Sequence, residues 1–431
     1  MEGDDTVKHN SSLREKLRSR YSYVDKGFIL FMLTVFQALS FAPVALGHKD
    51  EIFKISVLVA AYIIFEWVYV LFMSLALKKV NFELELIAFF LSGIGVCLIG
   101  SRYGYDPMEK QLICVVAGVF AYDVLLWFLK DVKRVMAVRN LIAVFAPLAF
   151  AACFFYIRFI SKTYVNGAWN WIYIGSISFQ PSEFVKVAFI FVGGATLDKL
   201  LKAKNIILYI VFSVTCIGVL FLMKDFGTAL IYFFTFIVIA YMRSGDVRSI
   251  LYICAIALLG AVLIIIFLPH VLSRFETYRH VWEDVNNRGY QQARVLIYTV
   301  SGGLLGLGVG NGQLRNVYAS TSDLVFGMVC EEMGILIGMA IVFSLAFLAV
   351  YAIKCSRNAP STFYSISACA AAAMLLFQTC LNIFGITDIL PLTGVTLPFV
   401  SKGGSSVIAC WALFAFIKAA DIRAYPKLYK T

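Results

Sequence analysis

The sequence is poor in charged residues: Lys, Arg, Asp and Glu make up 15% of its 431 residues, whereas hydrophobic residues make up 61%. A water-soluble protein of this length needs a charged surface, so the composition excludes a soluble domain. The apolar residues form runs of roughly 17–25, long enough to cross a bilayer core of about 30 Å. These runs lack the alternation of apolar and polar residues that is typical of membrane β-barrels. The sequence therefore predicts an all-α polytopic membrane protein.

Motifs for several kinds of ligand are also missing. The glycine-rich stretch SGGLLGLGVGNG, residues 301–312, lacks the GK[ST] ending of a P-loop, and no strand precedes it. Close backbone packing, or a tight turn against substrate, is the better account of its glycines. No cluster of His, Cys and carboxylates has metal-ligand spacing, so no structural metal is predicted. The ten cysteines lie in or beside apolar segments, which predicts free thiols.

Twelve apolar segments are candidate membrane spans. The polar stretch 1–26 is too long and too mixed in charge for a signal peptide, so we interpret it as a retained tail, with a second tail at 421–431. Between the tails we predict N-terminal membrane helices over 27–160 and a membrane core over 161–420 that includes one long loop, 270–321. The twelve predicted spans are 27–47, 53–77, 82–101, 111–129, 140–160, 183–198, 206–223, 226–242, 249–269, 322–353, 361–386 and 403–420.

The net charge of +11 reflects Lys and Arg clustered in short loops, rather than nucleic-acid binding. The positive-inside rule places these loops and both termini in the cytoplasm. Alternation of the spans then places segments 161–182, 270–321 and 387–402 on the outer face. Three segments rich in polar motifs are therefore predicted to meet at one surface. The basic loops are Lys78–Lys79, Lys130–Arg139, Lys199–Lys204, Arg243–Arg248 and Lys354–Arg357.

The long polar loop contains the adjacent acids Glu283 and Asp284 in VWEDVNNRGYQ. Such a pair in an exposed loop is commonly solvated surface. This loop, however, holds few acids among several arginines and aromatic residues, and nearby cations keep a carboxylate ionised at neutral pH. An ionised carboxylate can accept a proton from an attacking sugar hydroxyl, and arginines can stabilise a departing pyrophosphate. The surrounding residues are Arg274, Tyr278, Arg279, Trp282, Arg288, Tyr290, Arg294 and Arg315.

A second candidate is FQPSEFVK, residues 179–186, at the start of a predicted span. Glu183 and Lys186 are spaced i, i+3, so they share a helical face and can pair. Such a pair can be purely structural, with each charge neutralising the other. Charges within a membrane segment, however, usually face a cavity or a partner. Asp225, in KDFGTAL, is another acid on the predicted outer side that could join them.

The stretch PLTGVTLPFVSKGGSS, residues 391–406, combines prolines, glycines and hydroxyl side chains beside a span. Irregular backbone at membrane depth is tolerated where it lines a cavity or is buried in protein. Gln378 and Asn382 lie one turn apart on the preceding helix, where hydrogen bonds between helices are the plain alternative to a role in binding.

These segments, in this order, resemble the SEDS family (shape, elongation, division and sporulation), the FtsW/RodA/SpoVE group of bacteria. The matching pieces cover roughly residues 165–420 and also include MKDFGTAL and SDLVFGMVCEEMGILIG. The resemblance implies a core of ten spans, so either the first two of the twelve predicted here are an N-terminal addition or one of the predicted spans is wrong. It also implies a plasma-membrane peptidoglycan glycosyltransferase that polymerises lipid II, with inversion, for cell division or cell shape.

The resemblance further implies roles for particular residues. Asp284 matches the family's outer-loop aspartate and is the expected general base toward the acceptor sugar. The implied partners are lipid II, the undecaprenyl-pyrophosphate-linked glycan, a class B penicillin-binding protein that acts as transpeptidase, and other divisome or elongasome membrane proteins. A divalent cation, Mg²⁺ or Mn²⁺, on the substrate pyrophosphate is left open. The expected substrate-binding residues are Glu183, Lys186, Asp225, Arg279, Arg288, Tyr290, Gln291, Ser401 and Ser405.

The sequence departs from the family pattern at three places. Val285 replaces a proline after the acidic pair, the stretch 317–323 lacks a histidine, and Lys402 stands where an aromatic residue is common. Two other functions remain open: a flippase for lipid-linked precursors, and an inactive scaffold of a cell-wall complex. A flippase needs a polar path through both leaflets, whereas the motifs here gather on one side, which favours the enzyme.

Overall fold

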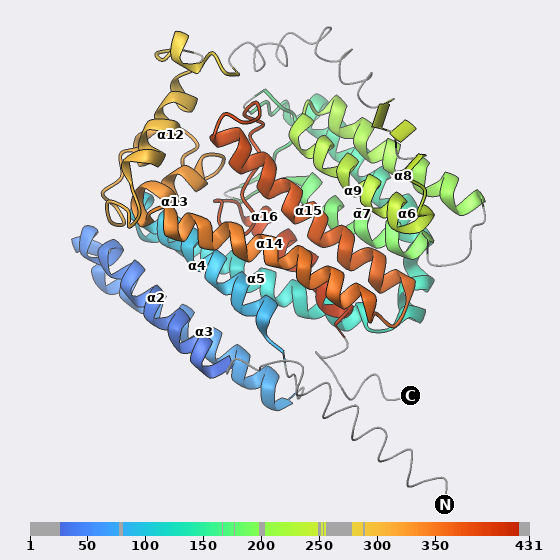
Figure 1. The fold of residues 1–431 in the computed structure, drawn as a ribbon, viewed down its shortest axis with the longest axis horizontal. Helices are drawn as coiled ribbons and strands as arrows, with labels where there is room; N and C mark the ends of the chain where they lie inside the picture. The colour runs from blue at the N-terminus through green and yellow to red at the C-terminus, as the bar shows by residue number, and fades with distance from the viewer. Residues whose placement is uncertain are drawn as a thin grey trace, which may run out of the picture.

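The computed structural model is a bundle of long helices (Figure 1). Among the described residues, eight helical segments are long and apolar enough to cross a membrane, and two shorter apolar helices accompany them. The all-α polytopic class predicted from the sequence is confirmed. The residues that the structure describes are 26–76, 81–165, 167–175, 177–197, 203–248, 251–252, 254–255, 278–287 and 289–421.

Five helical segments precede FQPSEFVK, as the sequence predicted. The third, α4, is central, because 89% of its apolar stretch is buried, compared with 11% for the fifth. The first two lie side by side at the edge of the bundle (Figure 1). The five segments are α2 (Lys26–Gly47), η1 (Lys49–Glu51) with α3 (Ile52–Ala76), α4 (Glu83–Tyr103), α5 (Tyr105–Leu129), and α6 (Val132–Phe155), which continues as the π-helix η2 (Tyr156–Ser161).

One predicted boundary in this half is wrong. The basic run 130–139 was expected to be a loop, but its residues from Val132 onward form the first two turns of α6. Asp131 caps this helix by accepting a hydrogen bond from the backbone N–H of Lys133, and it pairs with Arg134 at 3.2 Å. A capped helix can extend beyond its apolar stretch, because charged side chains are solvated there.

The second half begins with a structure that the sequence did not predict. Two short strands in the segment 161–182 pair antiparallel, with Ile172 opposite Phe179. The predicted span 249–269 lies outside the described residues, apart from four positions. The elements of this half are β1 (Ile172–Ile174), β2 (Ile177–Phe179), α7 (Pro181–Leu197), α8 (Ala203–Leu222), α9 (Phe226–Ser244), η3 (Val281–Glu283), α12 (Tyr290–Ser301), η4 (Leu314–Asn316), α13 (Val325–Met333), α14 (Ile335–Arg357), α15 (Thr362–Ile386) and α16 (Gly404–Ala419).

The last helix, α16, lies within the bundle and packs against α5, α15 and α7. Its Trp411 is fully buried, with the rings of Phe89 and Tyr122 5.1 and 5.9 Å away. Near the C-terminal end of α16, the buried Lys418 pairs with Glu85 of α4 at 3.1 Å. A buried charge needs such a partner, so this ion pair fixes α16 against α4.

The predicted span 322–353 is not one helix. The structure divides it into the short α13 and the membrane-crossing α14, with Gly334 between them at φ 87°. This conformation is unfavourable for residues with a Cβ, so the helix breaks there. A Cβ on Gly334 would also lie 2.3 Å from the carbonyl oxygen of Leu304, because the glycine-rich loop packs against this junction.

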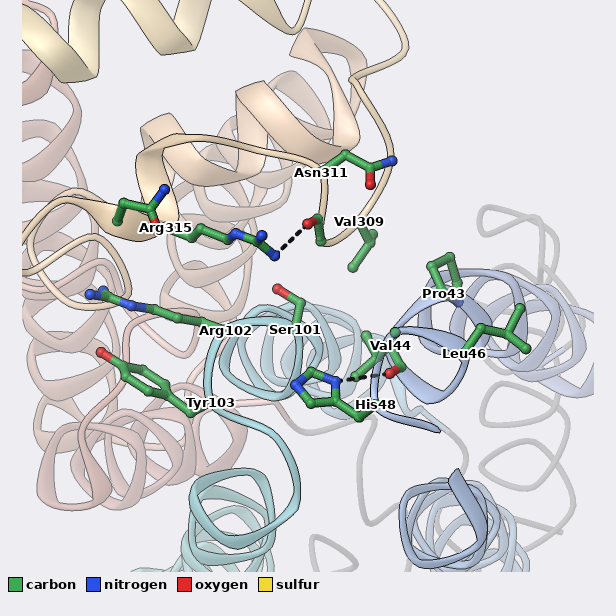
Figure 2. Close-up of a pocket in the computed structure, with 13 residues that line it drawn as sticks. Pro43, Val44, Leu46, His48, Ser101, Arg102, Tyr103, Val309, Asn311 and Arg315 are labelled. Carbon is green, nitrogen blue, oxygen red and sulfur yellow. Dashed lines mark hydrogen bonds between the residues drawn. The ribbon is translucent and has the colours of Figure 1, made fainter. Parts of the chain in front are cut away.

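The predicted loop 270–321 is not wholly irregular. Its described part contains the helix α12 and the two 3-10 turns η3 and η4. Its glycine-rich stretch lies directly on the backbone of α13: a Cβ on Gly302 would be 2.0 Å from the carbonyl oxygen of Cys330. The interpretation of these glycines as sites of close backbone packing is therefore confirmed for Gly302 and Gly306, whereas a Cβ on Gly303 or Gly310 would meet no atom within 4 Å. The same loop, the end of α4 and the end of α2 border a cavity of about 870 Å³ (Figure 2).

We expect Gly302→Ala to destabilise the protein by about 1–3 kcal/mol, because the added methyl group forces two backbone segments apart. The measurement is thermal unfolding of the purified protein in detergent. Gly218→Ala in α8 is the matched control, since a Cβ there meets no atom within 4 Å. Equal unfolding temperatures for Gly302→Ala and wild type would contradict the packing described here.

Candidate functional site

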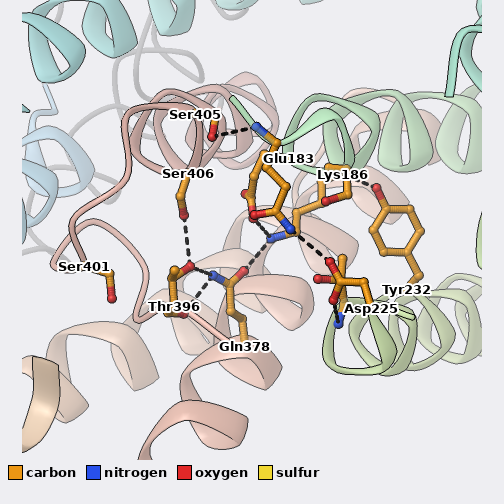
Figure 3. Close-up of polar contacts among 12 residues, drawn as sticks. Glu183, Lys186, Asp225, Tyr232, Gln378, Thr396, Ser401, Ser405 and Ser406 are labelled. Carbon is orange, nitrogen blue, oxygen red and sulfur yellow. Dashed lines mark hydrogen bonds and ion pairs between the residues drawn. The ribbon is translucent and has the colours of Figure 1, made fainter. Parts of the chain in front are cut away.

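A buried charged network lies at the start of α7 (Figure 3). Lys186 and Glu183 are 1% and 4% exposed, and their Nζ and Oε1 atoms are 2.8 Å apart, which confirms the predicted pair. Lys186 also donates to Oε1 of Gln378 on α15 at 2.9 Å. The amide nitrogen of Gln378 then donates to the carbonyl oxygen and hydroxyl of Thr396, at 2.9 and 3.0 Å. One chain of contacts thus joins α7, α15 and the segment before α16.

Asp225 lies beside this network, at the N-terminus of α9. Its Oδ1 caps the helix by accepting a hydrogen bond from the N–H of Thr228. Its Oδ2 accepts hydrogen bonds from the side-chain amides of Asn170 and Gln180, both at 2.9 Å. Gln180 lies at the entrance to α7, so the carboxylate connects α9 to the hairpin and to the FQPSEFVK segment.

The two predicted serines join different segments: Ser405 connects the start of α16 to Gln180, and Ser401 holds the turn before α16. Ser405 accepts a hydrogen bond from the backbone N–H of Gln180 at 3.3 Å. The hydroxyl of Ser401 accepts from the N–H of Leu397 at 2.8 Å and donates to the carbonyl of Ser322. Both side chains are buried against protein groups.

The prediction that three motif-rich segments meet is confirmed for their described residues. Segment 161–182 contacts the start of α16 through Gln180 and Ser405. Segment 270–321 contacts 387–402 through Thr321, whose carbonyl accepts a 2.7 Å hydrogen bond from the N–H of Lys402. Tyr278 also donates to the carbonyl of Ile389 at 2.7 Å. Three segments distant in sequence therefore converge at one end of the bundle.

Asp284 lies in the turn between η3 and α12 and is partly exposed. Its Oδ1 accepts a hydrogen bond from the side chain of Asn287 at 2.8 Å, and its carbonyl accepts one from the N–H of Gly289 at 3.0 Å. The turn is compact, since a Cβ on Gly289 would lie 2.5 Å from the carbonyl oxygen of Val281. The acid is therefore held on a fixed turn while its side chain stays accessible.

The other predicted binding residues of this loop are distributed around α12. Tyr290 begins α12, and its ring lies 5.4 Å from the guanidinium of Arg294. Gln291 donates to the carbonyl of Tyr318 at 3.4 Å. The backbone N–H of Arg279 donates to Asp388 at 3.4 Å, and its side chain is exposed. Arg288 lies outside the described residues.

Sequence reasoning missed two acids, Glu331 and Glu332, because it placed them in a membrane span. Both are buried on α13 and bind backbone N–H groups of the glycine-rich loop. Glu331 accepts hydrogen bonds from Gln313 and Leu314 at 2.7 and 2.9 Å, and Glu332 accepts one from Gly310 at 2.8 Å. The sequence did carry a signal for this role. The two adjacent acids are followed by Met-Gly and come shortly after the glycine-rich stretch, whose backbone they bind.

These features define a class: a polytopic helical membrane protein with a buried charged network at the start of α7 and an irregular segment before α16 that contacts it. The chain belongs to the FtsW/RodA/SpoVE family of cell cycle proteins, whose family model matches residues 98–425. The resemblance stated from the sequence motifs is thus confirmed. Helices α2 and α3 and most of α4 lie before the matched region.

Curated relatives agree with this assignment. Stage V sporulation protein E of Bacillus subtilis is 32% identical over 253 residues, which cover 56% of this chain and 68% of that protein. A probable peptidoglycan glycosyltransferase FtsW of Buchnera aphidicola is 31% identical, over 57% of this chain and 64% of the relative. The peptidoglycan glycosyltransferase RodA of Mycobacterium tuberculosis is 25% identical, over 76% of this chain and 75% of the relative.

Solved structures share the fold. A chain from a peptidoglycan synthase complex that coordinates polymerisation and crosslinking matches with a TM-score of 0.65 and 21% identity. RodA of Thermus thermophilus matches with a TM-score of 0.56 and 20% identity. Each covers 81% of this chain, and the matches cover 99% and 98% of the two solved chains.

We expect Glu332 to make stability depend on pH. Burial raises the pKa of its carboxyl from 4.5 to about 7, although the hydrogen bond from Gly310 opposes the change. The folded protein then holds this proton more tightly than the unfolded chain does. The resulting stabilisation is complete below pH 4.5 and is lost as the pH rises through about 7, a difference on the order of 3 kcal/mol.

The measurement is the unfolding temperature of purified protein at pH 5 and pH 8. Glu332→Gln should lose less stability than wild type over this interval, because an amide does not ionise there. Glu283→Gln, at an exposed position, is the control and should follow wild type. A Glu332→Gln variant with the full wild-type pH dependence would exclude this role.

Proposed function

We propose that the chain is a peptidoglycan glycosyltransferase that polymerises lipid II at the outer face of a bacterial plasma membrane. In this reaction the 4-hydroxyl of the acceptor GlcNAc attacks C1 of the donor MurNAc. A β-1,4 bond forms with inversion, the hydroxyl proton leaves, and undecaprenyl pyrophosphate departs with the electron pair of the broken C1–O bond. The observation that carries the proposal is the buried charged network at the start of α7, together with the partly exposed Asp284 on its turn, in a chain of this family.

Asp284 is the proposed general base. A base must reach the proton that it removes, and a partly exposed carboxylate on a fixed turn meets this requirement. The hydrogen bond from Asn287 orients its Oδ1. Nearby, Trp282 and Tyr290 expose 60% and 39% of their surface and offer aromatic faces for sugar rings.

The network around Lys186 is the proposed site for polar parts of the substrate. Three buried side-chain oxygens in or near this network have no hydrogen-bond partner within the described part of the chain. They are Oε2 of Glu183, Oδ1 of Asn382, one turn after Gln378 on α15, and Oδ1 of Asn170, whose amide nitrogen binds Asp225. Buried polar atoms are normally paired, so such atoms favour a ligand or ordered water. Asp225, Ser401 and Ser405 position the segments that surround this site, and Arg279, Arg288, Tyr290 and Gln291 belong to the acidic loop.

The proposed partner is a class B penicillin-binding protein, which crosslinks the strands that this enzyme makes. The similarity to a chain of a peptidoglycan synthase complex supports this partner. We further propose that both termini face the cytoplasm, in agreement with the basic loops. A divalent cation bound to the substrate pyrophosphate is the proposed cofactor, and cation dependence of purified enzyme would test it.

Asp284→Ala should abolish polymerisation, with a loss of at least about 10²-fold. The assay uses purified protein, its cognate transpeptidase and labelled lipid II, with glycan strands separated by length. Glu283→Gln, on the neighbouring residue, is the matched control and should keep most of its activity. Wild-type product from Asp284→Ala, with normal membrane insertion, would refute the role of this acid.

Lys186→Met should destabilise the protein by roughly 3–5 kcal/mol, because it leaves the Glu183 carboxylate buried without its cation. The double variant Glu183→Gln/Lys186→Met should recover much of this loss in thermal unfolding. If the pair binds substrate, the double variant nevertheless polymerises lipid II slowly. Wild-type turnover by the stable double variant would reduce the pair to a structural role.

A further inference from the structure

The cavity beside α2 has two chemically different walls (Figure 2). One wall is the end of α2, with Pro43, Val44 and Leu46, and Leu46 is 65% exposed. The opposite wall is the glycine-rich loop, with Asn311 and Arg315. Because α2 is a membrane span, its apolar wall continues the lipid-facing surface of the protein. The cavity therefore suits a ligand with one apolar and one polar part.

The polar wall is rich in positive charge. In Figure 2 the guanidinium of Arg315 extends across the cavity toward the α2 side. It donates to the carbonyl of Gly310 at 2.6 Å, and it forms no ion pair with an acid within the described residues. The guanidinium has five N–H donors, so this single bond leaves donors for an anion. Arg102, which donates to Ser320, adds a second cation to the lining.

Smaller groups complete the floor of the cavity. The ring of His48 uses Nδ1 toward the carbonyl of Val44 at 3.1 Å, and the hydroxyl of Ser101 lies between this ring and Arg315 in Figure 2. Beyond them, Lys402 lies 4.1 Å from the centre of the Tyr103 ring. His48, Ser101 and Tyr103 line the opening itself, whereas Lys402 contacts it only through the ring of Tyr103.

Two acids lie behind this opening, and the charge of Arg315 acts on the carboxyl of one of them, Glu332. Glu332 accepts hydrogen bonds from the N–H of Gly310 and from Ser101, so its Oε2 serves the loop backbone. Glu51 accepts a hydrogen bond from the N–H of Tyr105 at 3.0 Å. Neither residue lines the cavity. The lining is therefore cationic on one side and apolar on the other.

We propose that this cavity binds the phosphate of an anionic amphiphile, with Arg315 on the phosphate and the apolar chain along α2. Arg binds phosphate through several charge-assisted hydrogen bonds, and a volume of about 870 Å³ accommodates a head group. The α2 wall lies outside the part of the chain that matches the family model. The site is therefore built jointly by the N-terminal addition and the family core.

The test is native mass spectrometry of the full-length protein in detergent, titrated with phosphatidylglycerol or phosphatidylcholine. Wild type should bind phosphatidylglycerol at least about tenfold more tightly, because only this lipid carries a net negative charge. Arg315→Gln should lose about tenfold in affinity, and Asn311→Asp should weaken binding by adding a negative charge to the same wall. Arg134→Gln, on α6, is the control and should bind as wild type does.

A competition arm distinguishes the sources of the phosphate. Displacement of the lipid by inorganic phosphate would show that the site recognises the phosphate group alone. Retention of the lipid would show that the chain along α2 contributes, and Leu46→Ser should then weaken binding. Equal affinity for the two lipids would overturn the proposal. So would undiminished binding of phosphatidylglycerol by Arg315→Gln and Asn311→Asp, when both unfold at the wild-type temperature.

Discussion

The side chain of Gln378 makes the contact on which the site depends. Its oxygen accepts a hydrogen bond from Lys186, and its nitrogen donates to Thr396, so one amide connects α7, α15 and the irregular segment before α16. Unsatisfied polar groups are costly at membrane depth, and this amide satisfies a cation and a carbonyl together. The charge of Lys186 is balanced by Glu183 in the same place. The network can therefore remain buried and still keep an unpaired carboxylate oxygen.

The same constraint explains how the loops are held at this end of the bundle. Irregular backbone cannot satisfy its own N–H groups as a helix does, so buried side chains take that role. Glu331 and Glu332 bind the glycine-rich loop, Asp225 binds the amides beside the hairpin, and Ser401 binds the turn before α16. The segment that carries Asp284 is held at both ends, because Tyr278 donates to the carbonyl of Ile389 and Gln292 donates to the carbonyls of Gly385 and Ile386. A general base needs such a fixed position.

Buried side-chain hydrogen bonds also join the two N-terminal helices, α2 and α3, to each other and to the core. Gln37 of α2 donates to Glu66 of α3 at 2.8 Å, and Tyr62 of α3 donates to the carbonyl of Phe89 on α4 at 3.1 Å. Closer to the two-walled cavity, the thiol of Cys97 on α4 donates to the carbonyl of Ser40 on α2 at 3.2 Å. A segment outside the matched family region therefore shapes the surface beside residues 309–316.

The sequence by itself determined the membrane class, the five helices before FQPSEFVK and the pairing of Glu183 with Lys186, because apolar length and helical spacing are local properties. Family-specific motifs in a fixed order determined the enzyme class. Only the tertiary structure decided that 322–353 breaks at Gly334, that Glu331 and Glu332 hold a loop, and that Gln378 completes the network. Each of these depends on a contact between segments far apart in the chain. Local periodicity carries no information about such contacts, so they follow from packing alone.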